Sequence, residues 1–227
     1  GAAEPDPEEP DPYGWAAEVT ALLAERARQA QAELEVAVPR EVSVSQLVEL
    51  RRSPATFASR LRRPVPFKPN PYARRGTAFH AWLEDRFGSP ALLGEDELPG
   101  SHDEPNQDLE ALKESFLSSE WAQRTPSYVE APFEITIGEA VVRGRMDAVF
   151  AERDGWVVVD WKTGEKPSRE AMDSAQLQLA VYREAWRRIA SDGKPVRAVF
   201  FYVRTGETFA PELELSPDDR GAIVTGA

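Results

Sequence analysis

The chain has 227 residues, a length that fits one large domain, and its 41% hydrophobic and 29% charged residues are ordinary for a soluble globular protein. Cysteine is absent, which excludes disulfides, thiolate zinc sites and iron–sulfur clusters and fits a reducing cytoplasm. No apolar stretch approaches the roughly 20 residues of a membrane helix, and no basic-then-apolar leader is seen. We therefore expect a cytoplasmic protein with no membrane partner.

The formal net charge of −12 argues against a nucleic-acid partner, because DNA-binding proteins usually carry a basic surface. The charges are unevenly distributed, however. Residues 50–83 contain no Asp or Glu and eight basic residues, namely Arg51, Arg52, Arg60, Arg62, Arg63, Lys68, Arg74 and Arg75. Such a locally basic segment can bind phosphate, although a solvated helix face would have the same composition.

The first half of the chain has mostly helical patterns. Residues 1–12 are acidic and rich in proline, which predicts disorder. Apolar residues at helical spacing predict a helix over 13–36. Two short helices are expected between 43 and 64, with Ser43 or Ser45 capping the first and Ser53-Pro54 opening the second.

Further along, "GTAFHAWLEDRFG" predicts a helix that begins at Thr77 and ends at Gly88. A loop is expected over 89–107, and an amphipathic helix over 108–124 that stops before a proline. These helices belong to a predicted N-terminal part of the domain, residues 13–125.

After Pro126 the apolar periodicity changes from 3.6 to 2, which predicts three antiparallel strands over 128–138, 139–152 and 155–163. A long helix follows over 168–190, then a fourth strand over 195–206, and "TFAPELEL" can form a fifth. This order predicts an α/β protein with a mixed central sheet flanked by helices. We expect residues 126–227 to form the αβ core of a single structural domain that has an N-terminal helical extension.

A group of charged residues lies at the ends of two of these strands. Asp160 and Lys162, in "WVVVDWKTG", share one face of a strand, because successive side chains alternate. A two-residue turn at Asp154-Gly155 would place Asp147 opposite Lys162, and a four-residue loop would place it opposite either Lys162 or Asp160. All three groups then lie on one face, whereas a three-residue loop would separate them.

Two carboxylates this close repel each other, and a divalent cation removes the repulsion. Hard oxygen ligands favour Mg²⁺ or Mn²⁺, which also bind phosphate oxygens. A neighbouring Lys162 can stabilise the charge that develops on the phosphate or orient the attacking water. Taken alone, however, a D-x-K sequence is more often an ordinary surface ion pair.

Combined, these motifs resemble a known family. "GRMD" at 144–147, "DWKTG" at 160–164, Gln178 with Tyr182, and "RRGTAFHAWLE" at 74–84 are similar to the RecB-like branch of the PD-(D/E)XK nucleases. The resemblance covers roughly residues 43–205, in the family's order. It is greatest to the nuclease domains of actinobacterial AdnAB-type helicase–nucleases, without distinguishing the AdnA from the AdnB subunit.

The resemblance implies a role for each matched position. Asp147 and Asp160 would bind the metal together with His80 and the backbone carbonyl of Trp161, and Lys162 would be the catalytic lysine. The residues expected to support this site or to contact DNA are Glu84, Gln178, Tyr182, Arg143, Arg145, Arg74 and Arg75. Arg143 and Arg145 share the strand face of Asp147 and either meet phosphate or pair with acids.

The function implied is that of an Mg²⁺- or Mn²⁺-dependent deoxyribonuclease domain acting on single-stranded DNA during double-strand break resection and recombinational repair. No G-x-x-x-x-G-K-(S/T) motif is present, so we expect no nucleotide cofactor here. The helicase motor would lie elsewhere in the parent chain, alongside a partner subunit. Two alternatives are a catalytically inert DNA-binding or docking module of the same fold and a stand-alone endonuclease.

Overall fold

The computed structural model describes residues 15–29, 36–64, 71–88 and 107–211. The chain divides into two compact units, Gly1–Ala37 and Val38–Ala227. The described part of the first unit contains helix α1 (Trp15–Gln29), which lies within the helix predicted for 13–36. Among the described helices, none combines the length and the apolar character that crossing a membrane requires. The predicted disordered residues 1–12 and the greater part of the predicted loop, 89–106, lie outside the described residues.

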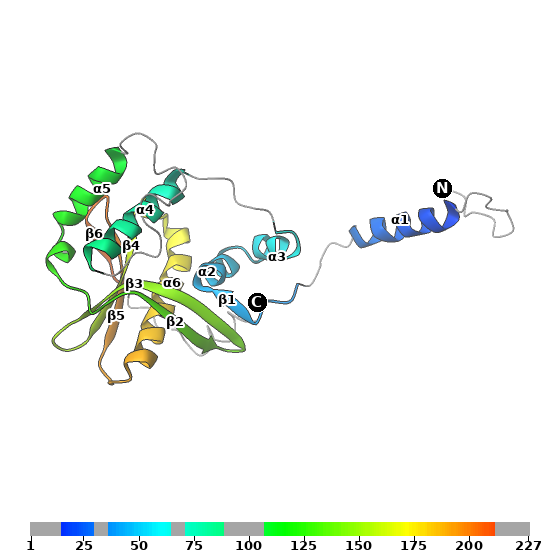
Figure 1. Ribbon diagram of the computed structural model, residues 1–227. Coiled ribbons are helices and arrows are strands. Elements are labelled where there is room, and N and C mark those ends of the chain that lie inside the picture. The colour runs from blue at the N-terminus through cyan, green and yellow to red at the C-terminus, as the bar shows by residue number, and fades with distance from the viewer. Residues whose placement is uncertain (1–14, 30–35, 65–70, 89–106, 212–227) are drawn as a thin grey trace. The chain divides into compact units, whose positions relative to one another are not determined.

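The second unit is built on a mixed sheet (Figure 1). Strand β3 (Ala140–Ala151) pairs in parallel with β1 (Glu41–Ser43) and antiparallel with β2 (Tyr128–Ile137) and β4 (Trp156–Lys162). Strand β5 (Val196–Tyr202) is parallel to β4, and the short β6 (Glu207–Phe209) pairs antiparallel with β5. The mixed α/β architecture predicted from the sequence is therefore confirmed.

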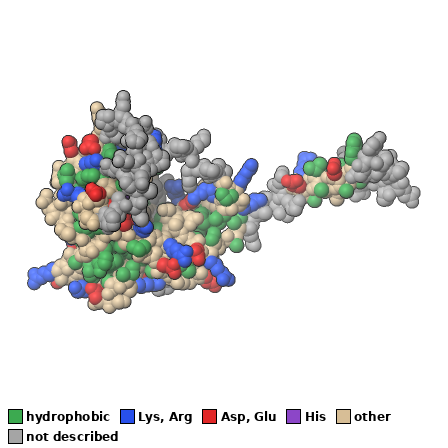
Figure 2. Space-filling view, viewed as in Figure 1, with side chains coloured by type: hydrophobic (Ala, Val, Ile, Leu, Met, Phe, Trp, Pro, Cys, Tyr) green, Lys and Arg blue, Asp and Glu red, His purple; other side chains and the backbone are tan. Residues whose placement is uncertain are grey.

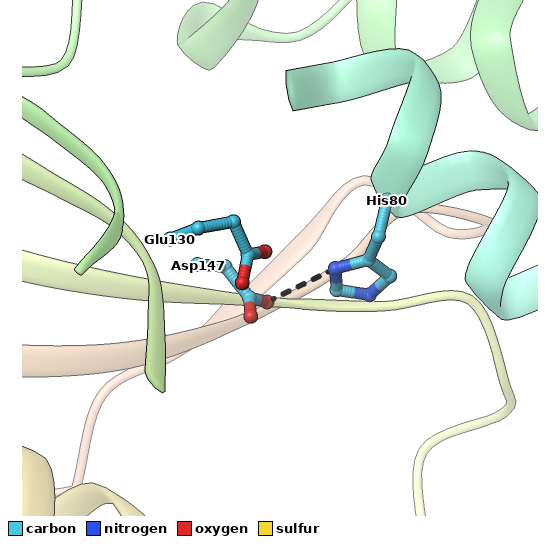
Figure 3. A group of neighbouring side chains, drawn as sticks. All are labelled: His80, Glu130 and Asp147. Carbon is cyan, nitrogen blue, oxygen red and sulfur yellow. Dashed lines mark ion pairs between the residues drawn. The ribbon is translucent and has the colours of Figure 1, made fainter. Parts of the chain in front are cut away.

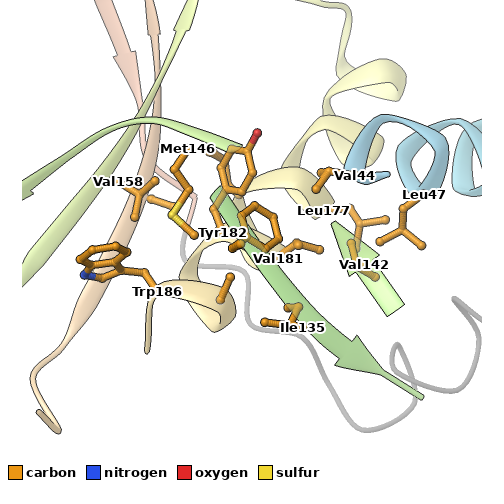
Figure 4. Packing of buried hydrophobic residues seen from close by; sticks show 14 of the residues in the cluster. Val44, Leu47, Ile135, Val142, Met146, Val158, Leu177, Val181, Tyr182 and Trp186 are labelled. Carbon is orange, nitrogen blue, oxygen red and sulfur yellow. The ribbon is translucent and has the colours of Figure 1, made fainter. Parts of the chain in front are cut away.

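Helices cover both faces of this sheet. On one face α2 (Val44–Arg52) and α6 (Arg169–Ala190) contribute Leu47 and Val181 to a core that includes Val158 of β4 (Figure 4). On the other face α4 (Pro71–Arg86), α5 (Gln107–Leu117) and a 3₁₀ turn, η2 (Glu120–Gln123), pack against the sheet. Helix α3 (Pro54–Arg62) packs against α2. The central strands are thus buried on both faces, which holds their ends rigidly.

Several predicted boundaries are confirmed and others are corrected. Ser43 caps α2 with a reciprocal side-chain bond to Gln46, as a capping box does, and Ser53 precedes α3. Helix α4 begins at Pro71 rather than at Thr77, because proline suits the first turn of a helix and the chain continues helically through it. The helix predicted over 108–124 ends at Leu117 and a 3₁₀ turn follows.

The strand predictions need two corrections. Strand β1 was not predicted, because three residues are too few to show a period of 2. Of the fifth predicted strand, 208–215, the described residues form the short β6, and residues 212–215 lie outside the described part of the chain. The loop between β3 and β4 has four residues, and the paired strands have the register Ala148–Val159 to Ala151–Trp156. One step further in that register, Asp147 is opposite Asp160, which is one of the two arrangements predicted for a four-residue loop.

Candidate metal centre

The site forms where β3 and β4 separate. Their last paired residues on this side are Ala148 and Val159, so Asp147 and Asp160 occupy the next position along each strand. The backbone N–H of Trp161 donates to Asp147 Oδ2 at 2.8 Å instead of to a backbone carbonyl of β3. The two acids therefore lie where the backbone pairing of β3 with β4 ends, and the carboxylate of Asp147 accepts the backbone N–H of β4 at this point.

The alternation of side chains changes at Asp147. Met146 and Val149 both belong to the core under α2 and α6, whereas Ala148 and Phe150 belong to the opposite core. A regular strand would not place 146 and 149 on the same face. On the neighbouring strand, Glu130 has a positive φ of 48°. The regular alternation assumed from the sequence therefore does not continue through Asp147, and its side chain lies beside α4.

His80, Glu130 and Asp147 form one compact group (Figure 3). Their potential ligand atoms all lie within 4.8 Å of one another, and His80 Nδ1 is 3.6 Å from Asp147 Oδ2. Glu130 is opposite Asp147 across β2 and β3, because the flanking pairs are Val129–Ala148 and Ala131–Met146. A nitrogen and two carboxylates at this spacing are a donor set suited to a divalent cation.

Glu130 was missed by the sequence analysis. It lies outside every matched motif and belongs to a strand that reads as an ordinary alternating one. Pairing the predicted strand 128–138 with the strand of Asp147 would have been the one way to find it. A left-handed backbone conformation at a residue other than glycine is costly and tends to occur at functional sites. That cost supports a role for Glu130 beyond the fold.

Asp160 lies in a second group, packed against α6. Its side chain is almost fully buried, Lys162 Nζ lies 2.7 Å from Oδ2, and Gln178 Nε2 donates to Oδ1 at 2.7 Å. The Tyr182 hydroxyl donates to Oδ1 at 3.3 Å and accepts from Gln178 Nε2 at 2.8 Å. Gln178 Oε1 in turn accepts from Lys162 Nζ at 3.3 Å. Four of the residues predicted for the site are thus brought together.

Asp160 Oδ2 has an ion-pair partner but no well-aligned hydrogen bond from the described residues. The ammonium of Lys162 lies close enough to balance the charge of Asp160, but it is not directed at Oδ2 as a hydrogen-bond donor. A buried carboxylate oxygen whose lone pairs accept no hydrogen bond is available as a ligand for a cation. This oxygen therefore fits a metal bound beside the group of His80, Glu130 and Asp147.

The pKa shifts of the three clustered residues also favour a bound cation. Burial, followed by the charge of Asp160, raises the pKa of Asp147 well above its usual value. Burial, followed by the charge of Asp147, raises the pKa of Glu130 to about 7. Burial also lowers the pKa of His80, which favours the neutral imidazole that binds metals. A cation would relieve the repulsion between the acids and bind a histidine that is already deprotonated.

The remaining predicted residues differ in their surroundings. Glu84 is close enough to raise the pKa of both Glu130 and Asp147 by its charge. Arg143 bonds to Glu134 and Glu41 at 2.6 and 2.7 Å, so of the two roles predicted for it the structure shows pairing with acids. Arg74 is exposed at the start of α4, and Arg75 pairs with Asp108. The proposed role of the Trp161 carbonyl stays a prediction.

Two motif glycines permit close packing at this centre. A Cβ on Gly76 would lie 3.3 Å from Thr163 Oγ1, so α4 contacts the turn that follows Lys162 one helical turn before His80. A Cβ on Gly144 would lie 2.8 Å from the ring of Phe133 and 2.9 Å from Val44. Glycine at these positions lets α4 and α2 approach the strands that bear the acids.

The chain is thus an α/β protein with a mixed sheet between two helical layers, and a histidine and two carboxylates suited to a divalent cation lie where two central strands part, beside the ion pair of Asp160 and Lys162. A sequence model of the PD-(D/E)XK nuclease superfamily matches residues 41–223, and the chain belongs to this superfamily. A search of curated proteins finds no significant match.

Among solved structures, a candidate exonuclease from Eubacterium rectale is similar, with 14% identity, a TM-score of 0.48, and coverage of 82% of this chain and 76% of that one. The protein SSO0001 is also similar, with 17% identity, a TM-score of 0.40, and coverage of 90% and 82%.

Proposed function

We propose that this chain is a metal-dependent deoxyribonuclease domain that hydrolyses phosphodiester bonds of single-stranded DNA. The observation that carries the proposal is the group of His80, Glu130 and Asp147 beside the ion pair of the buried Asp160 with Lys162. These three acids and the imidazole, with the Trp161 carbonyl, would hold Mg²⁺ or Mn²⁺. A cation bound there would stabilise negative charge on the phosphate and lower the pKa of a nearby water.

Lys162 is positioned to act on the substrate phosphate. Its ammonium is held between Asp160 and Gln178 and lies 4.8 Å from the ring centroid of Phe200, while its side chain is 34% exposed. A cation restrained in this way can stabilise charge as it develops in the transition state without first reorganising. The catalytic role of Lys162 thus depends on an ammonium that is restrained by its neighbours on a side chain that is still partly exposed.

Gln178 and Tyr182 act on the site through Asp160. They lie one turn apart on α6 and bind the same carboxylate oxygen, Oδ1. Oδ2 is left to the ammonium of Lys162. In our proposal, these two residues keep Asp160 in the orientation that a shared cation requires, in the way that hydrogen-bonded partners hold metal ligands in other proteins.

DNA would reach the site along the basic segment before His80. Arg52, Arg62 and Arg63 are exposed at the ends of α2 and α3. Figure 2 shows basic side chains interspersed with acidic ones on the viewed face rather than one continuous basic surface. With a net charge of −12, the domain alone should bind DNA weakly. This supports delivery of the strand by a helicase motor in the same parent chain, working in the cytoplasm with a partner subunit in break resection and repair.

A cleavage assay separates this proposal from its two alternatives. The purified chain is incubated with linear single-stranded, linear duplex and circular DNA, with Mg²⁺, Mn²⁺ or a chelator. We expect metal-dependent cleavage of single strands, and Asp160→Ala should abolish cleavage while leaving the circular dichroism spectrum unchanged. No cleavage by the wild type would favour an inert module, and preferred cutting of circular duplex would favour a stand-alone endonuclease. Full activity of Asp160→Ala would remove Asp160 from the mechanism.

A further inference from the structure

We propose that Arg145 binds a backbone phosphate next to the scissile one, and that the cation bound by Glu130 frees Arg145 for this contact. The inference rests on the proposed function and adds to it a substrate-binding residue whose engagement depends on the metal. It follows from the different surroundings of two arginines on strand β3, Arg143 and Arg145.

Arg143 has its charge compensated within the protein. Its Nε donates to Glu134 at 2.6 Å and its Nη1 donates to Glu41 at 2.7 Å. Glu134 is directly opposite Arg143 across β2 and β3, and Glu41 comes from β1 on the other side. Because this guanidinium already makes two charge-assisted hydrogen bonds, replacing them with bonds to a phosphate would gain little free energy. Arg143 therefore links strands β1, β2 and β3 through its two ion pairs.

Arg145 has a weaker partner that belongs to the metal centre. Its Nη1 lies 3.8 Å from Glu130 Oε2, within ion-pair range but too far for a hydrogen bond, and its side chain is 48% exposed. Glu130 is one of the three residues whose ligand atoms converge in Figure 3. When that carboxylate neutralises a cation, its charge is no longer available to Arg145. The guanidinium then presents an uncompensated charge and a fork of donors to solvent beside the site.

The position of Arg145 suits a neighbouring phosphate rather than the scissile one. It precedes Asp147 by two residues on a strand, which is a separation of about 7 Å along the backbone. A planar guanidinium binds two phosphate oxygens at once, which a lysine cannot do. The bound cation would therefore hold the scissile phosphate and, by neutralising Glu130, would leave Arg145 available to bind the neighbouring phosphate. DNA binding and metal binding should be coupled through Glu130.

The first test measures DNA affinity with and without metal. A fluorescent oligothymidylate is titrated by anisotropy at low salt and at a pH of about 8, where Glu130 is ionised with or without metal. All chains carry Lys162→Ala so that the DNA stays intact. In Mg²⁺ we expect Arg145→Gln to weaken binding about tenfold or more, Arg145→Lys to weaken it less, and the matched control Arg143→Gln to stay within about twofold. Without Mg²⁺, Arg145→Gln should change affinity little. An equal loss with and without metal would overturn the coupling.

The second test locates the phosphate. Single methylphosphonates, which are uncharged, are placed one at a time along the oligonucleotide. We expect one position to weaken binding of the chain with Arg145 and to have no effect on the chain with Arg145→Gln. If every position acts alike on both chains, or if Arg145→Gln weakens Mn²⁺ binding in calorimetry without DNA, then Arg145 supports Glu130 only and the proposal fails. Failure of the proposed function is distinct, because the unmodified chain would then cleave no DNA in Mg²⁺.

Discussion

Metal binding by this chain should strengthen as pH rises from about 5 to 8. The pKa of Glu130 is raised to about 7 by burial and by Asp147, and that of Asp147 is raised as well. Because these pKa values are higher in the folded chain than in the unfolded one, the metal-free fold binds more protons between pH 4.5 and 7, and its free energy of unfolding falls as pH rises through that window. A cation must displace those protons, so acid opposes its binding.

The size of the effect follows from Glu130. A pH of about 5.5 is 1.5 units below the pKa of about 7 of Glu130. The cation must then displace a proton from this carboxyl, which lowers the affinity of the chain for the metal by a factor of about 30. The raised pKa of Asp147 acts in the same direction and adds to this factor. At a metal concentration 100 times the Kd, stabilisation is about 2.7 kcal/mol, which is roughly 5–10 °C in Tm for a domain of this size.

Thermal unfolding is followed at a pH of about 5.5 and at a pH of about 8, on either side of the pKa of about 7, over a series of Mn²⁺ concentrations. We expect the midpoint of the metal-induced rise in Tm to move to Mn²⁺ concentrations lower by about 30-fold or more at the higher pH. Glu130→Gln is the matched control, and it should bind Mn²⁺ more weakly at the higher pH and show a flatter pH dependence. A midpoint that does not move, or that moves the other way, would refute the assignment of Glu130 and Asp147 as ligands.

Three further predictions concern the surroundings of the site. Gln178→Leu should slow cleavage by about 10- to 100-fold, and Tyr182→Phe by less, because Gln178 donates to Asp160 at 2.7 Å and Tyr182 at 3.3 Å; rates at saturating Mn²⁺ check this. Gly144→Ala should lower the free energy of unfolding by about 1–3 kcal/mol, measured in urea, because its Cβ would meet the ring of Phe133. DNA binding by the unmodified chain should fall steeply with salt and be lost near physiological ionic strength, which anisotropy would show.

The half of the site that depends on short-range geometry could be predicted from the sequence. Asp160 and Lys162 are two residues apart on a buried strand, and Gln178 and Tyr182 are four apart on a helix. Regular periodicities bring each pair together, and the observed network joins the two pairs. The three consecutive antiparallel strands β2, β3 and β4 were also predicted. Of these, β4 has a continuous apolar run because helices cover both faces of the sheet there.

The other half depends on irregular backbone, which periodicity cannot foresee. Glu130 joins the centre through a strand with a left-handed residue, and Asp147 lies where the alternation of β3 changes. His80 arrives from a helix some 67 residues before Asp147, so no local pattern places the two together. For the same reason, the sequence could not tell that Arg143 is held by Glu41, which lies on a strand of three residues.

The central claim is that a single divalent cation binds where β3 and β4 part. A crystal of the chain soaked in Mn²⁺ tests it most directly, because anomalous scattering locates the ion independently of the protein. We predict a peak in contact with His80, Asp147, Glu130 and Asp160, with Asp160 Oδ2 turned from Lys162 toward it. A peak elsewhere, or none at a concentration that supports DNA cleavage, would contradict the account.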